Sequence, residues 1–201
     1  MKERGMIFNA EMVRAILDGR KTQTRRIVKS DCMDIGEKDD GTLWPWREHD
    51  NGGDYWYPCP FGAVGDRIWV RETFATLEPG SYEPVKPQHG YCQDLRYAAT
   101  DRLAKSGSDI RGYKWIPSLH MPRWASRITL EITGVRVERI ASISTESARA
   151  EGYPAERAAD GGVIDPWLWF RDLWDGIYPE QSFKANPWVW VIEFKRVEGG
   201  A

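Results

Sequence analysis

Hydrophobic residues near the N-terminus recur at the spacing of one helix face. These residues, three or four positions apart, are Met12, Val13, Ile16 and Leu17. Asn9 is a favourable N-cap and Gly19 a favourable left-handed C-cap, so the pattern predicts a helix over residues 10–18. The β-branched residues that follow predict a strand over residues 22–28.

Three later segments predict further strands. In residues 67–74, RIWVRETF, apolar positions alternate, which is typical of a strand that is buried on one or both sides. Residues 124–140 predict two strands that meet at a bulge or bend at Gly134. The unbroken apolar run in residues 188–196, WVWVIEFKR, predicts a central position in the sheet.

Capping signals predict two more helices. Ser144 caps residues 145–151, which end at Gly152, and Asp165 opens a helix that ends near Gly176. The chain then has five or six strands and three short helices, which do not alternate regularly. We therefore predict an α+β fold built on a small, mixed, partly closed β-barrel, and not a doubly wound sheet.

Two long stretches carry turn signals and little periodicity. Residues 29–62 predict a surface excursion of loops, and residues 76–120 predict an irregular segment with one short strand at 95–99. Four tryptophans lie among the glycines and prolines of these stretches: Trp44, Trp46, Trp56 and Trp115. Such aromatic residues either stack on nucleic-acid bases or cover the core from a long loop.

Composition limits the kind of protein. We expect one domain over residues 1–201, and a net charge of −2 gives it no overall attraction for nucleic acid. No apolar stretch reaches the ~18 residues that cross a bilayer, so we expect a cytoplasmic protein without membrane contact, and we favour a monomer.

The cysteines and histidines suggest neither disulfides nor a metal centre. Cys32, Cys59 and Cys92 are odd in number and widely spaced, as expected for reduced thiols. His89 and Cys92 form an isolated pair, whereas a metal site needs three or four ligands. We therefore expect no metal and no cofactor.

Residues 20–29, RKTQTRRIVK, contain five cations and no acid. Such a run at a chain reversal indicates a phosphate-bearing or nucleoside ligand. In a strand Thr24 and Arg26 share a face, and Lys21 reaches that face if it lies in the turn after Gly19. Positive neighbours and burial lower the pKa of a lysine, which could then activate a threonine hydroxyl. The alternatives are anion binding without catalysis and a solvated basic edge.

The spacing of Gly19, Lys21, Thr24 and Arg26 resembles the G-x-K-x-x-T-x-R signature of the ASCH domain family, which implies a PUA-like β-barrel. Other segments also resemble this family in order: Gly65-Asp66 before IWV, ISTESARAEGY at 143–153 and VIEFK at 191–195. The chain, with its insertions at 29–62 and 76–120, resembles the larger phage or prophage members.

The resemblance extends, at DGIYPEQ (175–181), to the family's bacterial acetylcytidine amidohydrolases. It implies that Thr24 attacks the acyl carbonyl, that Lys21 activates Thr24, and that Glu151 serves the leaving amine or the water. Four further residues are candidates for substrate binding: Arg25, Arg26, Glu72 and Trp69. Glu72 competes with Glu151 for the role of site carboxylate, and Trp69 fits core packing as well as substrate contact.

Three functions are compatible with these observations. The first is hydrolysis of an amide on a modified nucleoside such as acetylcytidine. The second is binding of RNA or a modified base without reaction, in which basic residues contact phosphates. The third is metal-independent RNA cleavage with lysine and glutamate as acid–base groups.

Overall fold

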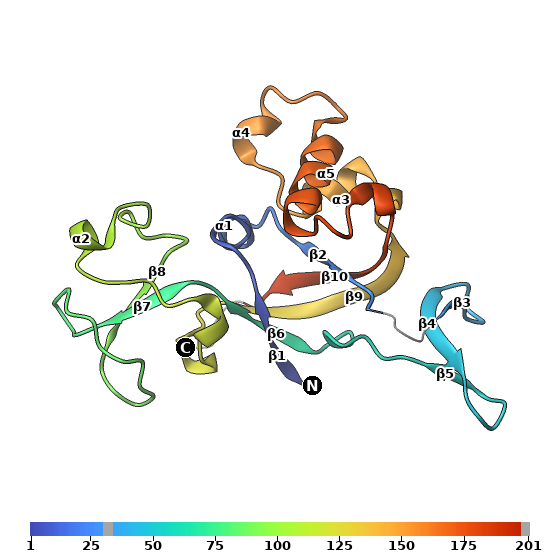
Figure 1. Ribbon diagram of the computed structural model, residues 1–201, viewed down its shortest axis with the longest axis horizontal. Coiled ribbons are helices and arrows are strands. Elements are labelled where there is room, and N and C mark those ends of the chain that lie inside the picture. The colour runs from blue at the N-terminus through green and yellow to red at the C-terminus, as the bar shows by residue number, and fades with distance from the viewer. Residues whose placement is uncertain (30–33, 198–201) are drawn as a thin grey trace.

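The computed structural model describes residues 1–29 and 34–197, and its elements form a mixed α+β arrangement (Figure 1). Its strands are β1 (Glu3–Ile7), β2 (Gln23–Ile27), β3 (Asp34–Glu37), β4 (Leu43–Glu48), β5 (Asp54–Trp56), β6 (Arg67–Arg71), β7 (Phe74–Leu77), β8 (Asp94–Tyr97), β9 (Thr129–Arg139) and β10 (Trp188–Arg196). Its α-helices are α1 (Ala10–Leu17), α2 (Ser108–Arg111), α3 (Thr145–Ala150), α4 (Ala155–Ala158) and α5 (Asp165–Ile177). The predicted α+β class is confirmed.

A five-stranded sheet in the order β1-β6-β9-β10-β2 forms the centre of the molecule. β1 and β6 pair in parallel, and the other neighbours pair antiparallel. The apolar strand β10 lies between β9 and β2, so its predicted interior position is confirmed.

The edges of this sheet approach each other, although the described strands do not close into a barrel. The Arg26 side chain, on edge strand β2, donates from Nη2 to the carbonyl of Ile7, on edge strand β1, at 3.1 Å. Phe8 and Phe194 also pack edge to face, with ring centroids 6.3 Å apart. These contacts join the two ends of the sheet, as expected for partial closure.

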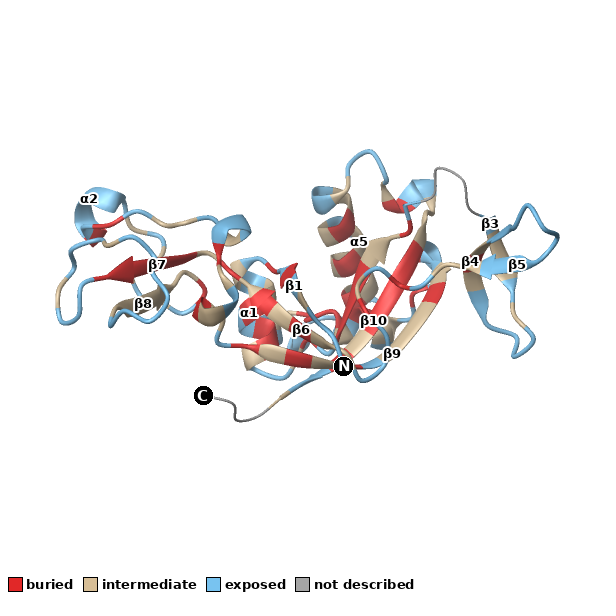
Figure 2. Cartoon of the chain, turned by 90° about the horizontal axis from the view of Figure 1, so that it is seen from below, coloured by how far each residue is buried: buried red, intermediate tan, exposed pale blue. Residues whose placement is uncertain are grey.

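Alternation along β10 separates two hydrophobic cores. The first core, between the sheet and α1, contains among others Phe8, Val13, Ile16, Ile68, Leu130, Trp190 and Ile192. The second core, between the sheet and α3 and α5, contains among others Ile140, Ala148, Phe170, Trp174, Val189 and Val191. In Figure 2 the buried positions lie in the central sheet, in the helices that pack on it and in β7. The sheet is therefore buried on both faces where β2 and β10 pair.

The predicted N-caps of α1 and α3 and the predicted glycine after α1 are confirmed. The Asn9 side chain accepts a hydrogen bond from the Met12 amide at 2.8 Å, and Gly19 follows α1 with φ +74°. The Ser144 hydroxyl accepts from the Ser147 amide at 3.1 Å. α4 was not predicted, because its four residues carry no periodic apolar pattern.

Two predicted strand boundaries were wrong. Residues 124–140 contain one strand, β9, because Glu193 pairs with Gly134 and Phe194 with Ile132, which leaves a bulge instead of a break. The predicted bulge at Gly134 is thus correct, but it bends one strand and does not separate two. Residues 67–74 are divided between β6 and β7, which pair with different partners.

Residues 29–62 were predicted as loops, and this was wrong. Residues 34–56 form a three-stranded antiparallel sheet, β3-β4-β5, whose turns coincide with the glycine-rich signals. Trp44 anchors it to the first core, since its ring lies 5.0 Å from that of Trp190 and its Nε1 donates to the Tyr57 carbonyl at 2.7 Å. Aromatic pairs between the strands, including Trp46 against Trp56, stabilise this sheet, although its sequence is mostly polar.

Residues 76–120 contain more structure than predicted. The expected strand at 95–99 is β8, shifted to 94–97, and it pairs with β7, which continues the buried apolar run to Leu77. A short helix, α2, and two small aromatic clusters complete this part of the molecule.

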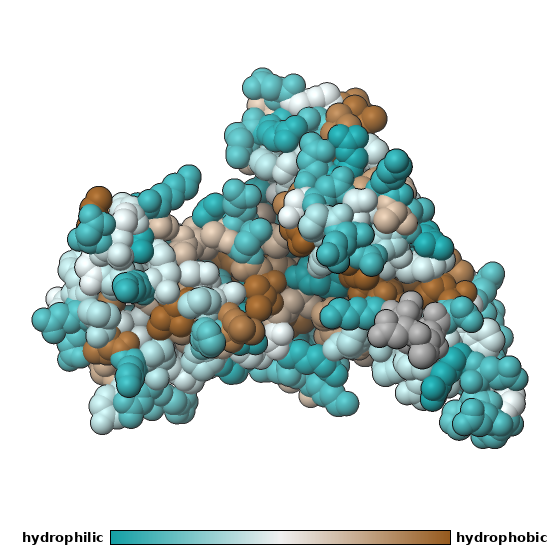
Figure 3. Space-filling view, viewed as in Figure 1, coloured by the Kyte–Doolittle hydropathy of each residue, from teal (hydrophilic) through white to brown (hydrophobic). Residues whose placement is uncertain are grey.

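The surface shown in Figure 3 has separate hydrophobic patches among hydrophilic residues. Within residues 1–29 and 34–197, every helix is too short or too polar to traverse a bilayer. The same residues contain no grouping of three or more metal-ligating side chains. Cys59 is a buried free thiol and Cys92 an exposed one, while Cys32 lies outside the described residues.

Candidate functional site

The turn after α1 places Lys21 against the end of α3. The Lys21 amide donates to the Ala15 carbonyl at 2.9 Å, so the chain reverses tightly past Gly19. Lys21 then forms an isolated antiparallel bridge with Glu151, and the Thr22 amide donates to the Ala150 carbonyl at 2.9 Å. The backbone therefore brings together two residues that are 130 positions apart in the sequence.

Lys21, Glu151 and Arg25 form a buried charged cluster. Lys21 Nζ donates to Glu151 Oε2 and to the Glu151 carbonyl, each at 2.8 Å. Arg25 Nη1 donates to the other carboxylate oxygen, Glu151 Oε1, also at 2.8 Å. The three side chains are only 0%, 4% and 1% exposed for lysine, glutamate and arginine respectively. Of the two carboxylates that compete for the site in the sequence, Glu151 is the one that binds Lys21.

Burial lowers the pKa of the Lys21 amine from its usual value of 10.5, because desolvation disfavours the charged form. The Glu151 carboxylate acts in the opposite direction, and Arg26 and Arg25 reinforce the lowering. A lysine with a lowered pKa can act as a base closer to neutral pH. Crowding by arginines, expected from the sequence, is thus a feature of this site.

Thr24 and Arg26 lie on the opposite face of β2 from Arg25. Thr24 is opposite Ile192 and Arg26 is opposite Trp190, both in the first core, whereas Arg25 is opposite Val191 in the second. Arg26 Nη1 donates to Thr24 Oγ1 at 2.8 Å. Thr24 and Arg26 share a face, as predicted, but both hydrogen bonds of the Lys21 amine go to Glu151.

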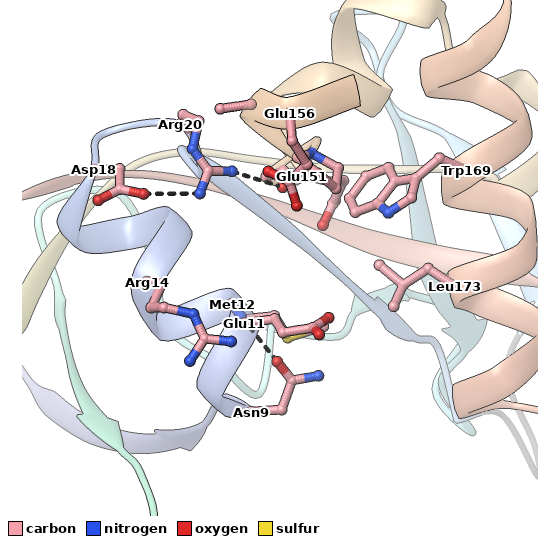
Figure 4. Close-up of a pocket in the computed structure, with 13 residues that line it drawn as sticks. Asn9, Glu11, Met12, Arg14, Asp18, Arg20, Glu151, Glu156, Trp169 and Leu173 are labelled. Carbon is pink, nitrogen blue, oxygen red and sulfur yellow. Dashed lines mark hydrogen bonds and ion pairs between the residues drawn. The ribbon is translucent and has the colours of Figure 1, made fainter. Parts of the chain in front are cut away.

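A pocket of about 370 Å³ opens between α1 and α5, and Glu151 is part of its wall (Figure 4). Asn9 and Met12 line it from the α1 side, and Trp169 and Leu173 from α5. Lys21 and Thr24 do not belong to its lining, so Glu151 is the member of the predicted catalytic set that the pocket reaches in the described structure.

Arg20 lines the same pocket near Glu151. Its guanidinium donates to Asp18 Oδ2 at 2.8 Å and to the carbonyls of Gly152 and Tyr153 at 3.2 and 2.9 Å. The Arg20 guanidinium is thus bonded to groups of the protein itself. The same is true of Arg25 and Lys21, so most cations of the basic run hold the fold together and do not form an open anion-binding patch.

The two other candidates lie elsewhere in the sheet. Glu72 is buried and paired with Arg127 by two hydrogen bonds, of 2.9 and 3.0 Å. Trp69 lies on β6, where the Arg71 guanidinium stacks on its ring at 5.4 Å. Both therefore have partners in or next to β6, apart from the contacts of Lys21 and Glu151.

The sequence interpretation missed Glu138 as a member of the cluster. Glu138 Oε1 accepts from Arg25 Nη2 at 2.6 Å and from Nε at 3.1 Å. A signal was present, since Glu138 follows the apolar Val137 inside a strand pattern, where an acid requires a partner. Which arginine supplies it depends on the sheet order, which the sequence does not state.

No protein-family model and no curated protein matches this chain. Among solved structures, the chain is similar to the crystal structure of an ASCH domain from Lactobacillus crispatus JV V101, with a TM-score of 0.38 and 13% sequence identity. The match covers 97% of this chain and 79% of that chain. A TM-score of this size assigns no function, so the function of this chain has to be inferred from the chemistry of its own site.

Proposed function

We propose that this protein hydrolyses the amide bond of an acylated nucleoside such as acetylcytidine, with Lys21, Thr24 and Glu151 as the catalytic set. The observation that carries the proposal is the buried pair of Lys21 and Glu151, 2.8 Å apart, of which Glu151 lines a pocket of about 370 Å³. A base with a lowered pKa beside a carboxylate that reaches a cavity is an arrangement suited to acyl transfer.

In the proposed reaction the Thr24 hydroxyl leaves Arg26 Nη1 and turns to the neutral Lys21 amine, which takes its proton, and the Thr24 oxygen attacks the acyl carbonyl. The C–N bond breaks, and Lys21 passes that proton to the leaving amine of the base. A water molecule then attacks the Thr24 ester while Glu151 accepts its proton. The acid is released, and the proton returns to Thr24.

The charges around the pocket favour an uncharged ligand. Its charged lining residues are the acids Glu11, Asp18, Glu151 and Glu156 and the bases Arg14 and Arg20. Arg20 is held by Asp18, and Arg14 donates to the Ala99 carbonyl at 3.0 Å. A phosphate would meet an excess of carboxylates, whereas a nucleoside would meet polar groups and the ring of Trp169, which can stack on a base.

The test is release of cytidine and acetate from acetylcytidine, with Thr24→Val and Thr24→Ser as a matched pair. Valine keeps the shape of threonine without its hydroxyl, and serine keeps the hydroxyl. We expect turnover by the wild-type protein and by Thr24→Ser, and none above background by Thr24→Val. Equal turnover by wild type and Thr24→Val would remove Thr24 from the mechanism, and absence of wild-type turnover would reject acetylcytidine as the substrate.

The orientation of Thr24 favours a second candidate, binding of a modified nucleoside or RNA without reaction. Thr24 Oγ1 accepts from Arg26 on one face of β2, while the Lys21 amine is bonded to Glu151. This candidate predicts saturable binding of intact acetylcytidine without products. For RNA, affinity falls with salt in proportion to the phosphates contacted, and Arg26→Ala flattens that dependence if Arg26 makes such a contact.

A further inference from the structure

Arg25 is a buried cation whose side-chain hydrogen bonds all go to two protein carboxylates. Its guanidinium donates to Glu138 through Nε and Nη2 and to Glu151 through Nη1, and its Cζ lies 5.6 Å from the centre of the Phe170 ring. Its side chain is only 1% exposed. Arg25 therefore has no surface left for a ligand, although the sequence suggested it as a substrate contact.

The two oxygens of Glu151 are shared between Lys21 and Arg25. Oε2 accepts from the lysine amine and Oε1 from the guanidinium. The Arg25 guanidinium is planar and rigid and is itself held by two bonds to Glu138, so its single bond to Oε1 ties that oxygen to a fixed donor. Without it, a carboxylate held by one lysine amine could rotate about its terminal torsion, which is broad for glutamate.

Arg25 is the buried end of a ladder of alternating charges that continues through Glu138, Arg136 and Glu193. Glu138 Oε2 accepts from Arg136 Nε at 3.1 Å, and Arg136 also pairs with Glu193. Exposure rises along this ladder from 1% at Arg25 to 20% at Glu138 and 38% at Arg136. The ladder runs from the surface of β9 and β10 to the buried amine, so it holds Arg25 at a fixed position.

We infer that Arg25 is a positioning residue, anchored by Glu138, that orients the Glu151 carboxylate toward Lys21. The inference rests on the proposed function for its catalytic consequence, and on the geometry alone for its effect on Lys21. The charged groups that face Lys21 are Glu151 from the end of α3 and Arg25 and Arg26 from β2. Removing Arg25 takes away one positive neighbour of Lys21, and Lys21 is then the one remaining cation that binds the Glu151 carboxylate in the described structure.

The first experiment needs no substrate. Lysine labelled with ¹³C at Cε is titrated by NMR in the full chain, and the Lys21 signal is assigned with Lys21→Met. Arg25→Gln is expected to raise the pKa of Lys21, because a neighbouring cation that lowers it is lost. Arg25→Lys keeps the charge and is expected to titrate close to wild type. A wild-type titration in folded Arg25→Gln would overturn the inference.

The second experiment measures acetylcytidine hydrolysis. Arg25→Gln is expected to lower kcat about 10- to 100-fold with little change in KM, since a misplaced catalytic group costs rate more than binding. Arg25→Lys should recover part of kcat. Arg171→Gln is the matched control, because Arg171 is 41% exposed and its ion pair is with its neighbour Asp172. Wild-type kcat in Arg25→Gln would overturn the positioning role.

Glu138→Gln keeps the test decisive if Arg25→Gln does not fold. It removes the anchor of Arg25 and leaves every charged neighbour of Lys21 in place, so kcat should fall while the Lys21 titration stays close to wild type. Unchanged kcat in folded Glu138→Gln would contradict the inference. If the wild-type protein hydrolyses no acetylcytidine, the proposed function fails, and the NMR titration still decides whether Arg25 controls Lys21.

Discussion

Lys21 and Glu151 are joined in three ways: by an ion pair of 2.8 Å between the amine and the carboxylate, by a hydrogen bond of 2.8 Å from the amine to the Glu151 carbonyl, and by a bridge between their backbones. The bridge fixes the backbone positions of the two residues, and the ion pair fixes the positions of their charged groups. Because both side chains are almost fully buried, desolvation is the largest influence on the pKa of Lys21; Glu151 opposes the lowering, and Arg26 and Arg25 reinforce it.

The lowered pKa of Lys21 predicts how stability depends on pH. The unfolded chain protonates this lysine below about 10.5, whereas the folded chain resists protonation. Between the pKa of Lys21 in the folded protein and 10.5, the unfolded state binds more protons. The contribution of Lys21 to the free energy of unfolding therefore rises with pH in this range. Below the pKa in the folded protein, Lys21 is charged in both states, and its desolvation lowers the free energy of unfolding by the full amount. Lys21→Met removes this dependence.

We therefore expect the free energy of unfolding of wild type, minus that of Lys21→Met, to increase on the order of 1 kcal/mol per pH unit within that window. Urea unfolding of both proteins from neutral pH to 10.5 measures it. A difference that stays constant with pH would show that the Lys21 pKa is not lowered.

Glu151→Gln should strongly destabilise the fold. It leaves the buried cations Lys21 and Arg25 without the carboxylate between them, and removing one partner of a buried ion pair costs about 3–5 kcal/mol. The control is Glu156→Gln, an exposed acid of the same pocket, which should change stability by less than about 0.5 kcal/mol. Combining Glu151→Gln with Lys21→Met should recover part of the loss, and strictly additive losses would contradict the coupling.

Gly152 holds the position of Glu151, and its replacement by alanine should cost more than the same change at Gly19. Both glycines have positive φ, +103° and +74°. A Cβ at Gly152 would lie 2.9 Å from Ala15 Cβ and 3.2 Å from Lys21 Cβ, whereas nothing lies within 4 Å of one at Gly19. Gly19→Ala should therefore cost only the backbone strain of about 1–2 kcal/mol, and Gly152→Ala more. Thermal or urea unfolding compares them, and equal losses would contradict the steric argument.

Trp44 should matter for the whole fold and Trp46 for the three-stranded sheet alone. Trp44 packs on Trp190 in the first core, whereas Trp46 packs on Trp56 within the β3-β4-β5 sheet. Trp44→Ala should lower the free energy of unfolding by about 3 kcal/mol, at the low end for a tryptophan because the ring is partly exposed. Hydrogen exchange should show faster exchange of residues 34–56 in both variants. Equal global losses would mean that Trp44 does not anchor the sheet.

The sequence was sufficient where a segment has a strong periodic pattern and clear caps. The α1 helix, the strand β10 and the bulge at Gly134 are predictable from local sequence alone, that is, from apolar spacing and glycine positions in a segment of about ten residues. The sequence was not sufficient for β3, β4 and β5, since these strands are short and are held by cross-strand aromatic pairs. Such pairs are visible only once the register is known.

The site was predictable in part for the same reason. The sequence motif placed Lys21 and Thr24, and the resemblance singled out Glu151, but the partner of Arg25 depends on which strand lies beside β10. Alternation places Arg25 on the face opposite Thr24 and Arg26, and this much could have been read from the sequence. The contact with Glu138 required the fold, because 113 residues separate the two.

The most direct measurement is mass spectrometry of protein quenched in acid during turnover of acetylcytidine. The proposed mechanism predicts an acetyl group on Thr24, enriched in Glu151→Gln, where the second step lacks its base, and absent in Thr24→Val. Turnover of acetylcytidine without any acetylated Thr24, or at an undiminished rate in Thr24→Val, would contradict the catalytic set proposed for this pocket.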